Sequence, residues 1–294
     1  MTAVGALTSD QVRAVLTSAT TAPSLYNSQP WRFRCTSTAI ELCADEAQRP
    51  PVADPEGREL RIACGAALLN LRVAIAGCGV HPVVRMLPDP HRTELLATVR
   101  PQGRRQMTPE ELALLAAMPR RHTNRRPFTS VPVPPRVISE LRRAAKSEHA
   151  WLARIVPSQV PLLRSLVRQA HAVQQKNPAF RAEWAAWLGT PPQQQDVEPN
   201  PLVVAVGSFH DLPLPQIQAG QAMQRVLLTA TAEGLSASFL SQVVEVPTVR
   251  RQLRGLVGGG LWPQVVLRLG YGALTSSTPR RPLAEVVDDE VALA

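Results

Sequence analysis

The sequence predicts an α+β fold in which mostly antiparallel sheets are flanked by helices. Segments with the apolar spacing of helices alternate with short segments in which apolar and polar residues alternate, as in half-buried strands. A sixteen-residue pattern also occurs twice: GAALLNLRVAIAGCGV at 65–80 aligns with GQAMQRVLLTATAEGL at 220–235, a shift of 155 residues. Similar elements precede and follow both copies, so we expect two related halves in one chain, residues 1–120 and 121–294.

Helices are predicted from apolar periodicity and from their end signals. The expected helices cover residues 9–20, 59–76, 109–119, 134–147, 159–176 and 215–233. Ser9 is the expected cap of the first helix. Thr108, Pro109 and Glu111 match a capping box with proline at the first helical position, so they mark the start of the third helix.

Strands are expected where short segments alternate in polarity or run apolar between turn signals. They cover residues 31–37, 39–45, 83–87, 95–100, 150–156, 202–208 and 265–271. In both copies of the repeated pattern a helix ends at a glycine before a strand begins. These glycines, Gly79 and Gly234, are expected to adopt the left-handed conformation that ends many helices.

Composition argues against several classes of protein. The chain has 294 residues, of which 45% are hydrophobic and 19% charged, as in a globular protein with a full apolar core. No apolar run is long enough for a membrane span, and the N-terminus lacks a secretory pattern, so we expect a cytoplasmic protein without a membrane partner. The four cysteines lack metal-ligand spacing, so we expect no metal and reduced thiols.

The formal net charge of +9 requires an explanation. The arginines are spread along the chain and no aromatic side chains are interleaved with them, which argues against a nucleic-acid partner. A bound anionic cofactor would account for some of them, and solvated surface arginine would account for the rest.

Three segments carry candidate ligand-binding chemistry. The loop APSLYNSQPW at 22–31 is dense in amides and hydroxyls, which suit a polar and planar ligand. RHTNRRPF at 121–128 places two arginines around a threonine in alternation, and the guanidinium fork suits phosphate oxygens. TPRRPL at 278–283 places two arginines between prolines. Either basic segment is also compatible with a solvated loop.

These segments resemble the signatures of the FMN-dependent nitroreductase family. The resemblance rests on APSLYNSQPWRF, RHTNRRPF, GLSASFLSQ and LGYGALTSSTPRRPLAEVV, and it spans nearly the whole chain. The repeated layout further resembles the dormancy-associated Acg branch, whose members look like a nitroreductase dimer fused into one polypeptide. The resemblance implies a nitroreductase-like fold, FMN as cofactor, NADH or NADPH as reductant and a small aromatic or nitro-type acceptor.

The resemblance also implies roles at the phosphate end of the flavin. In the family, one subunit gives an R-x-[S/T]-x-[R/K] segment and a C-terminal basic pair, and its partner gives the P-S-x-x-N loop. Carried over to this sequence, Arg121, Thr123, Arg280 and Arg281 hold the FMN phosphate. His122 faces the phosphate region by the same analogy, although an ordinary loop histidine fits the sequence equally well.

Six further residues are implied around the flavin ring and ribityl chain. They are Pro23, Ser24, Asn27, Arg125, Ser241 and Gln242. By the resemblance, the three loop residues contact the ribityl chain and ring, the arginine approaches the N1–O2 edge, and the last two lie with their backbone near N5. Since the flavin carries the redox chemistry, no catalytic side chain is assigned.

Each half has the motif that the other lacks. The first half has the P-S-x-x-N loop but nothing basic before its first helix, whereas the second half has the basic segments but no such loop. The pattern predicts one complete site and one defective site per chain. One chain then suffices for the site, and a dimer is compatible with the pattern.

Two alternatives remain open at the level of the sequence. Residues 177–201, with Trp184 and Trp187 on one helical face, fit a lid over the flavin, the substrate-facing helix of the family, or core. The leading function is an NAD(P)H-dependent oxidoreductase that works through FMN. The alternative is a weakly active or inactive protein that sequesters FMN under a lid.

Overall fold

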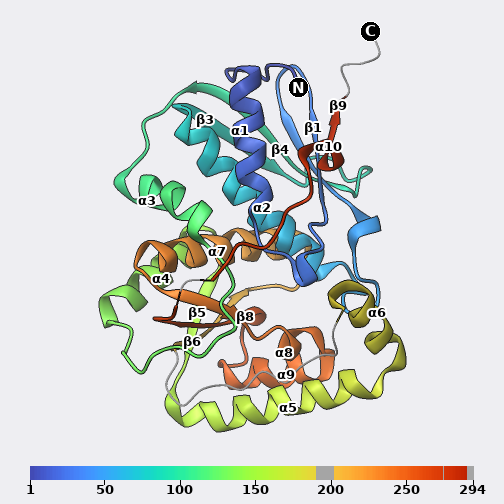
Figure 1. The fold of residues 1–294 in the computed structure, drawn as a ribbon, viewed down its shortest axis with the longest axis vertical. Helices are drawn as coiled ribbons and strands as arrows, with labels where there is room; N and C mark the ends of the chain where they lie inside the picture. The colour runs from blue at the N-terminus through green and yellow to red at the C-terminus, as the bar shows by residue number, and fades with distance from the viewer. Residues whose placement is uncertain (190–201, 274, 290–294) are drawn as a thin grey trace.

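Two sheets lie on opposite sides of a central pair of helices (Figure 1). The computed structural model describes residues 1–189, 202–273 and 275–289. In spatial order, the first sheet contains β3 (Val80–Met86), β4 (Leu95–Arg104), β2 (Ile40–Ala44), β1 (Trp31–Cys35) and β9 (Val287–Asp289). The second contains β5 (Trp151–Ile155), β6 (Leu202–Ser208), β8 (Trp262–Gly270) and β7 (Ser236–Phe239). Described neighbours are antiparallel except β1 and β9, which confirms the predicted fold class.

The central pair consists of the two helices of the repeated pattern, α2 (Arg58–Gly77) and α7 (Pro213–Ala232). The other long helices are α1 (Ser9–Thr20), α3 (Pro109–Ala117), α4 (Pro135–Ser147), α5 (Val160–Lys176), α6 (Pro178–Leu188) and α9 (Pro247–Leu256). Short helical turns are η1 (Leu25–Asn27), η2 (Glu46–Gln48), η3 (Met118–Arg120), η4 (Pro157–Gln159), α8 (Gln242–Glu245) and α10 (Leu283–Val286).

The predicted helices are all present, with ends within two residues of the prediction. The capping box of α3 is confirmed: the Glu111 N–H donates to Thr108 Oγ1, and Glu111 Oε2 accepts from the Thr108 N–H. The cap of α1 is Thr8 and not Ser9. Thr8 Oγ1 accepts from the Gln11 N–H, and Gln11 Oε1 accepts from the Thr8 N–H.

The sequence prediction gave no bounds for several elements. They are the strands β7 and β9 and the helices α6, α8, α9 and α10, of which α6 lies in the 177–201 segment where a helical face was expected. The two strands have only four and three residues, and they exist because β7 pairs with β8 and β9 pairs with β1. Long-range pairing of this kind leaves no periodic signal in a short segment.

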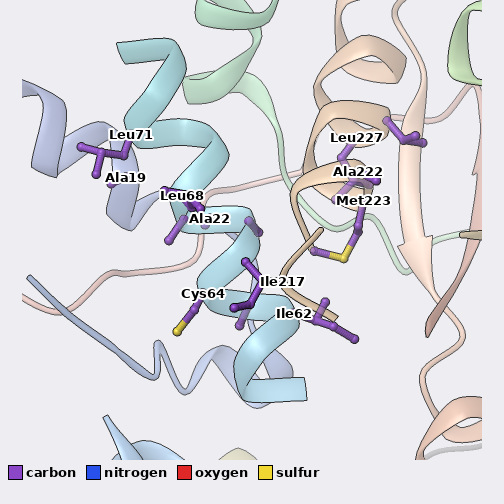
Figure 2. Packing of buried hydrophobic residues seen from close by; sticks show 14 of the residues in the cluster. Ala19, Ala22, Ile62, Cys64, Leu68, Leu71, Ile217, Ala222, Met223 and Leu227 are labelled. Atoms are coloured by element: carbon purple, nitrogen blue, oxygen red, sulfur yellow. The ribbon is translucent and has the colours of Figure 1, made fainter. Parts of the chain in front are cut away.

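Buried side chains such as Ile62 and Ile217 lie where α2 and α7 pack together (Figure 2). The two helices meet most closely at a pair of glycines. A Cβ atom on Gly65 would lie 2.2 Å from the Ile217 carbonyl oxygen, and one on Gly220 would lie 2.1 Å from the Ile62 carbonyl oxygen. Both pairs are separated by the same 155 positions (65 to 220 and 62 to 217). The contacts are therefore reciprocal, as a two-fold relation between the helices requires.

The ends of the paired helices follow the same relation. Gly79 and Gly234 both have a φ of 76°, in the left-handed region. The Gly79 N–H donates to Ala76 O, and the Gly234 N–H donates to Thr231 O, again with a shift of 155. The prediction that each helix ends at its glycine is confirmed. The boundary between residues 120 and 121 stays a prediction, since β9 crosses into the first sheet.

One apolar core continues across the helix pair. A single buried cluster includes Leu16, Leu68, Leu227 and Val265, which come from α1, α2, α7 and β8. Helix α2 is long and apolar enough to cross a membrane by length and composition, but 83% of its apolar window is buried inside the fold. Its hydrophobicity is therefore that of a core helix.

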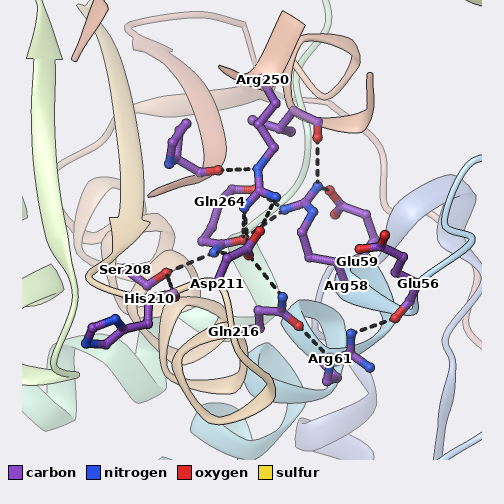
Figure 3. A network of polar contacts seen from close by, with 12 residues as sticks. Glu56, Arg58, Glu59, Arg61, Ser208, His210, Asp211, Gln216, Arg250 and Gln264 are labelled. Carbon is purple, nitrogen blue, oxygen red and sulfur yellow. Dashed lines mark hydrogen bonds and ion pairs between the residues drawn. The ribbon is translucent and has the colours of Figure 1, made fainter. Parts of the chain in front are cut away.

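A buried polar network also joins the first residues of α2 to the second sheet (Figure 3). Arg58 Nη1 donates to Gln264 O at 2.7 Å. Arg250 donates to Asp211 at 2.6 and 2.9 Å, and Gln264 Nε2 donates to Asp211 at 2.9 Å. These bonds satisfy charges that the core would otherwise leave unpaired, and they fix the second sheet against α2.

Gly65→Ala and Gly220→Ala should each destabilise the protein, because the added methyl group would overlap a backbone oxygen of the facing helix. We expect a loss of at least about 1–3 kcal/mol in the free energy of unfolding. Gly255→Ala is the matched control, since nothing lies within 4 Å of its added Cβ in α9. It should be neutral or gain about 0.5–1 kcal/mol from helix propensity. Urea unfolding of the three variants tests this, and equal midpoints would contradict the close packing.

Candidate functional site

The basic segment lies along the outer edge of β7, the last strand of the second sheet. Thr123 forms an isolated parallel bridge with Ala237, and the Asn124 N–H donates to Ala237 O at 2.8 Å. The buried Asn124 side chain donates to Ala273 O at 2.9 Å. These bonds fix residues 121–124 between β7 and the segment that follows β8.

The C-terminal segment runs from the second sheet to the first and passes the end of α1 (Figure 1). At its start, the Thr129 N–H donates to Tyr271 O at 2.8 Å. Further along, Arg280 donates to Thr20 O at 2.9 Å and to Thr21 O at 3.1 Å. Arg280 thus binds carbonyls at the C-terminal end of a helix, where they lack helical partners.

The 22–31 loop meets this segment through Asn27. Asn27 Nδ2 donates to Pro279 O at 3.0 Å, and Asn27 Oδ1 accepts from Arg280 Nη1 at 3.1 Å. The fold thereby brings together two of the three segments that the sequence singles out, although they lie about 250 positions apart in the chain.

The loop itself has an unusual backbone. Tyr26, Asn27 and Gln29 have φ angles of 54°, 60° and 53°, in the region that non-glycine residues seldom adopt. Ser24 Oγ accepts from the Gln29 N–H at 2.9 Å, which closes the turn, and Pro23 before it is buried. Strain of this kind persists where surrounding contacts hold the backbone in place.

Arg121 reaches the end of α1 from the basic segment. Its Nη2 donates to Thr21 O at 3.2 Å, the carbonyl that also accepts from Arg280. Arg121 is 4% exposed, and its Nε has no hydrogen-bond partner in the part of the chain that the structure describes. Burial, together with the charge of Arg280, lowers the pKa of Arg121 to about 10, and burial also lowers the pKa of Arg280.

These two cations make up a candidate anion site. Among the residues that the structure describes, neither Arg121 nor Arg280 forms an ion pair, and both donate to neutral carbonyl oxygens. Buried charges are costly unless they are paired. An oxyanion between the guanidinium groups would compensate both charges and bind the free Nε of Arg121.

The neighbours of this pair follow the sequence prediction in part. His122 is half-buried, and its pKa is lowered by burial and by the charges of Arg121 and Arg280. Thr123 is half-buried at the edge of β7. Arg125 is exposed to solvent, so the expected alternation of arginines does not place all of them on one buried face.

Arg281 is occupied by other partners. Its Nη1 lies 3.3 Å from Asp45 Oδ2, and its Nε lies 3.5 Å from Glu285 Oε2. The Arg281 N–H donates to Gln29 Oε1 at 2.9 Å. The sequence predicts Arg281 as a phosphate ligand, whereas the structure gives its charge carboxylate partners and places it between the loop and the C-terminal segment.

Ser241 and Gln242 lie just after β7, at the start of α8. Ser241 O accepts from the Val244 N–H at 2.9 Å, and the Gln242 side chain is buried. Thr123 also lies beside β7, through its bridge to Ala237. No described hydrogen bond joins Ser241 or Gln242 to Arg121 or Arg280.

Sequence reasoning missed Gln29 and Asn124 as site residues. Gln29 is 4% exposed and binds the C-terminal segment, and Asn124 is 1% exposed and joins that segment to β7. Both lie within the quoted motifs, and a signal was available: each is an amide next to a basic or proline-rich stretch that has to be held in place. The backbone carbonyls of Thr20 and Thr21 could not be recognised from the sequence, because every residue has a backbone carbonyl.

Comparison with known proteins extends over nearly the whole chain. No family model matches it. A protein of Mycobacterium tuberculosis strain H37Rv named "Putative NAD(P)H nitroreductase Rv3131" is 33% identical, covering 95% of this chain and 91% of the relative. The chain belongs to the nitroreductase family.

Two further proteins are similar to this chain. The nitroreductase relative named acg, also from strain H37Rv, is 26% identical over 95% of this chain and 96% of its own length, as expected from the resemblance to the Acg branch. A solved nitroreductase with bound FMN from Bacteroides fragilis is 16% identical, covers 57% of this chain and 94% of its own, and has a TM-score of 0.43.

In this nitroreductase-family chain, α6 packs against the 22–31 loop. The Trp184 ring meets the Tyr26 ring edge-on, with ring centres 5.1 Å apart. The Glu183 carboxylate accepts from the N–H groups of Val52 and Ala53 at 2.7 and 2.8 Å. Trp187 is half-buried, and residues 190–201 of the proposed lid lie outside the described part of the chain.

Glu245, at the end of α8, carries a carboxyl group that contacts α5. Gln174 Nε2 donates to Glu245 Oε2 at 2.6 Å. Burial, with the nearby Glu59 carboxylate, raises the pKa of Glu245 to about 8. The charge of Arg58 and the bond from Gln174 act in the opposite direction. Burial also raises the pKa of the Tyr26 hydroxyl, and the charge of Glu245 adds to that effect.

Stability should therefore fall as pH rises toward about 8, where native Glu245 ionises. Unfolded Glu245 loses its proton near pH 4.3, so the contribution is fully present below that value and is lost on the way to the native pKa. Glu245→Gln keeps an uncharged group of the same shape and should flatten this part of the profile. The exposed Glu56→Gln is the control. Urea unfolding between pH 5 and 9 tests this, and parallel profiles for Glu245→Gln and the parent would contradict it.

Proposed function

We propose that this chain is an FMN-dependent oxidoreductase that accepts hydride from NADH or NADPH. One observation carries the proposal: buried Arg121 and half-buried Arg280 converge on one carbonyl. In the described residues neither has a carboxylate partner, and Arg121 Nε has no hydrogen-bond partner. This donor set fits the phosphate of FMN, because two guanidinium forks can surround its anionic oxygens. Membership of the nitroreductase family supports the choice of FMN over other phosphate ligands.

The remaining sequence-predicted residues take their roles around this phosphate position. His122 and Thr123 lie beside the arginine pair at its phosphate end. Asn27, held by Pro279 and Arg280, fixes the loop that faces the ribityl chain and ring. A loop held through bonds to its own site residues presents its polar groups with little loss of entropy on binding.

The other loop and strand residues complete the proposed site. Pro23 and Ser24 shape the loop, Arg125 approaches the ring edge, and the backbone at Ser241 and Gln242 faces the reactive side of the ring. When bound, FMN supplies the hydride chemistry, and the chain binds and orients the ring and limits the access of water. No side chain is assigned to proton transfer. One chain supplies every part, so we expect one FMN per chain, with a dimer not required.

Arg121→Ala and Arg280→Ala should each weaken FMN binding by about 1.5–3 kcal/mol, or roughly 10- to 150-fold in Kd. Each change removes a charge-assisted hydrogen bond to the phosphate. Arg281→Ala should have the smaller effect, since Asp45 and Glu285 already pair with that charge. Fluorescence titration of FMN measures the affinities and the expected one equivalent per chain. The exposed Arg142→Ala is the control, and equal affinity in all four variants would remove the phosphate assignment.

Anaerobic addition of NADPH or NADH should bleach the visible absorption of the bound flavin if the chain is an oxidoreductase. Dithionite gives the fully reduced reference spectrum. Bleaching by dithionite but not by either nicotinamide would contradict the oxidoreductase proposal.

Bleaching by dithionite alone would favour the alternative, a protein that sequesters FMN under a lid. The packing of Trp184 on Tyr26 is the observation that favours it, because α6 then lies against the proposed flavin loop. In that case Trp184→Ala should permit reduction by NADPH, since it removes the contact that holds α6 to the loop. We also propose that the protein is cytoplasmic, since both NADH and NADPH are present in the cytoplasm.

A further inference from the structure

The two-fold relation assigns a counterpart to the candidate flavin site. On the first side, Asn70 of α2 donates to Ser18 O and Thr21 Oγ1 at the end of α1. The residue 155 positions later, Arg225 of α7, donates to Glu148 at the end of α4. Helix α1 packs on α2 as α4 packs on α7, so the end of α4 corresponds to the end of α1.

A cleft lies at this counterpart position. It has a volume of about 270 Å³, and its lining includes Arg72, Arg105, Arg225, His81 and Glu111. The motif comparison predicts no arginine cluster here, because these arginines come from the central helices and from the end of β4. The volume is just below the roughly 300–1,000 Å³ of ordinary small-molecule pockets.

Two of the cleft arginines, Arg72 and Arg225, bond a carboxylate of the chain, Glu148, which is not itself a lining residue. Glu148 is 4% exposed. Arg72 Nη1 donates to Glu148 Oε2 at 2.6 Å, Arg225 Nε donates to Glu148 Oε1 at 2.9 Å, and Arg225 Nη2 lies 2.7 Å from the same oxygen. Both carboxylate oxygens thus accept from guanidinium groups, as both would in a bound oxyanion.

We propose that Glu148 is the resident anion of this cleft, and that it occupies the place of a ligand oxyanion between Arg72 and Arg225. While the carboxylate is present, the cleft has no uncompensated charge for a phosphate. Its removal converts the cleft into an oxyanion site. The idea that this cleft mirrors a flavin site rests on the proposed function, but the claim about Glu148 concerns only the two arginines and their anion.

The remaining charges support this assignment. Glu111 pairs with Arg105 at 2.5 Å, and Glu110 lies 3.6 Å from Arg225 as an exposed partner. Each of the three cleft arginines therefore has a carboxylate partner, whereas Arg121 and Arg280 have none among the described residues. Of these carboxylates, only Glu148 bonds two arginines at once and is buried.

The test is thermal unfolding of Glu148→Ala in inorganic phosphate, with FMN in excess in every sample and chloride used to keep the ionic strength constant. The variant, in which the place of the carboxylate is vacant, should melt below the parent in chloride and regain stability as phosphate replaces chloride, while the parent shows no phosphate-specific gain. Glu140→Ala, which removes an α4 carboxylate that pairs with Arg136 near the surface, is the matched control and should respond like the parent. Adding Arg72→Gln to Glu148→Ala should abolish the phosphate response.

A Glu148→Ala variant without a phosphate-specific gain, or a parent with the same gain, would overturn the proposal. If Glu148→Ala does not fold in chloride, Glu148→Asp replaces it; that variant keeps the charge and should show no gain, and a gain would contradict the proposal. Because FMN is in excess in every sample, phosphate binding at the candidate flavin site does not contribute to the difference between variant and parent. The flavin spectrum, recorded separately, reports whether the proposed function itself fails.

Discussion

The close approach of α2 and α7 is the constraint on which the rest of the structure depends. Two helix backbones can come this near only where neither carries a side chain, and Gly65 and Gly220 supply that condition reciprocally. Both sheets are attached to this helix pair, so its geometry fixes the distance between them. The C-terminal segment has to bridge that distance, and Arg280 reaches the end of α1 only because it does.

The candidate site follows from a charge imbalance that this architecture creates. Arg121 lies beside the edge strand of the second sheet, and Arg280 lies in the segment that joins the two sheets. Both donate to backbone carbonyls at the end of α1. Their neighbour Arg281 is neutralised by Asp45 and Glu285. The fold thus gives the two neighbouring arginines different partners, carboxylates for Arg281 and backbone carbonyls for Arg280, a distinction that the sequence RR does not contain.

Much of the fold was predictable because its signals are local. The helices have periodic apolar faces, and Gly79 and Gly234 mark helix ends. The capping box that begins at Thr108 lies within four consecutive residues. Partner choice was not predictable in this way. Strand β9 is a strand because β1 lies beside it, and Arg72 and Arg225 meet Glu148 only after α4 has packed on α7. The motifs identified the loop and the basic segments, but not which of their cations would be free.

The pairing of β9 with β1 has a consequence for the order of folding. Phe33 pairs with Val287, so the first sheet acquires its last strand from the far end of the sequence. During synthesis the N-terminal strands emerge long before residues 280–289, and contacts of such sequence separation form late because loop closure has to precede them. Arg280 lies only a few residues before that strand. A nascent chain can therefore form most of its first sheet and its central helices before Arg280 binds the carbonyls at the end of α1.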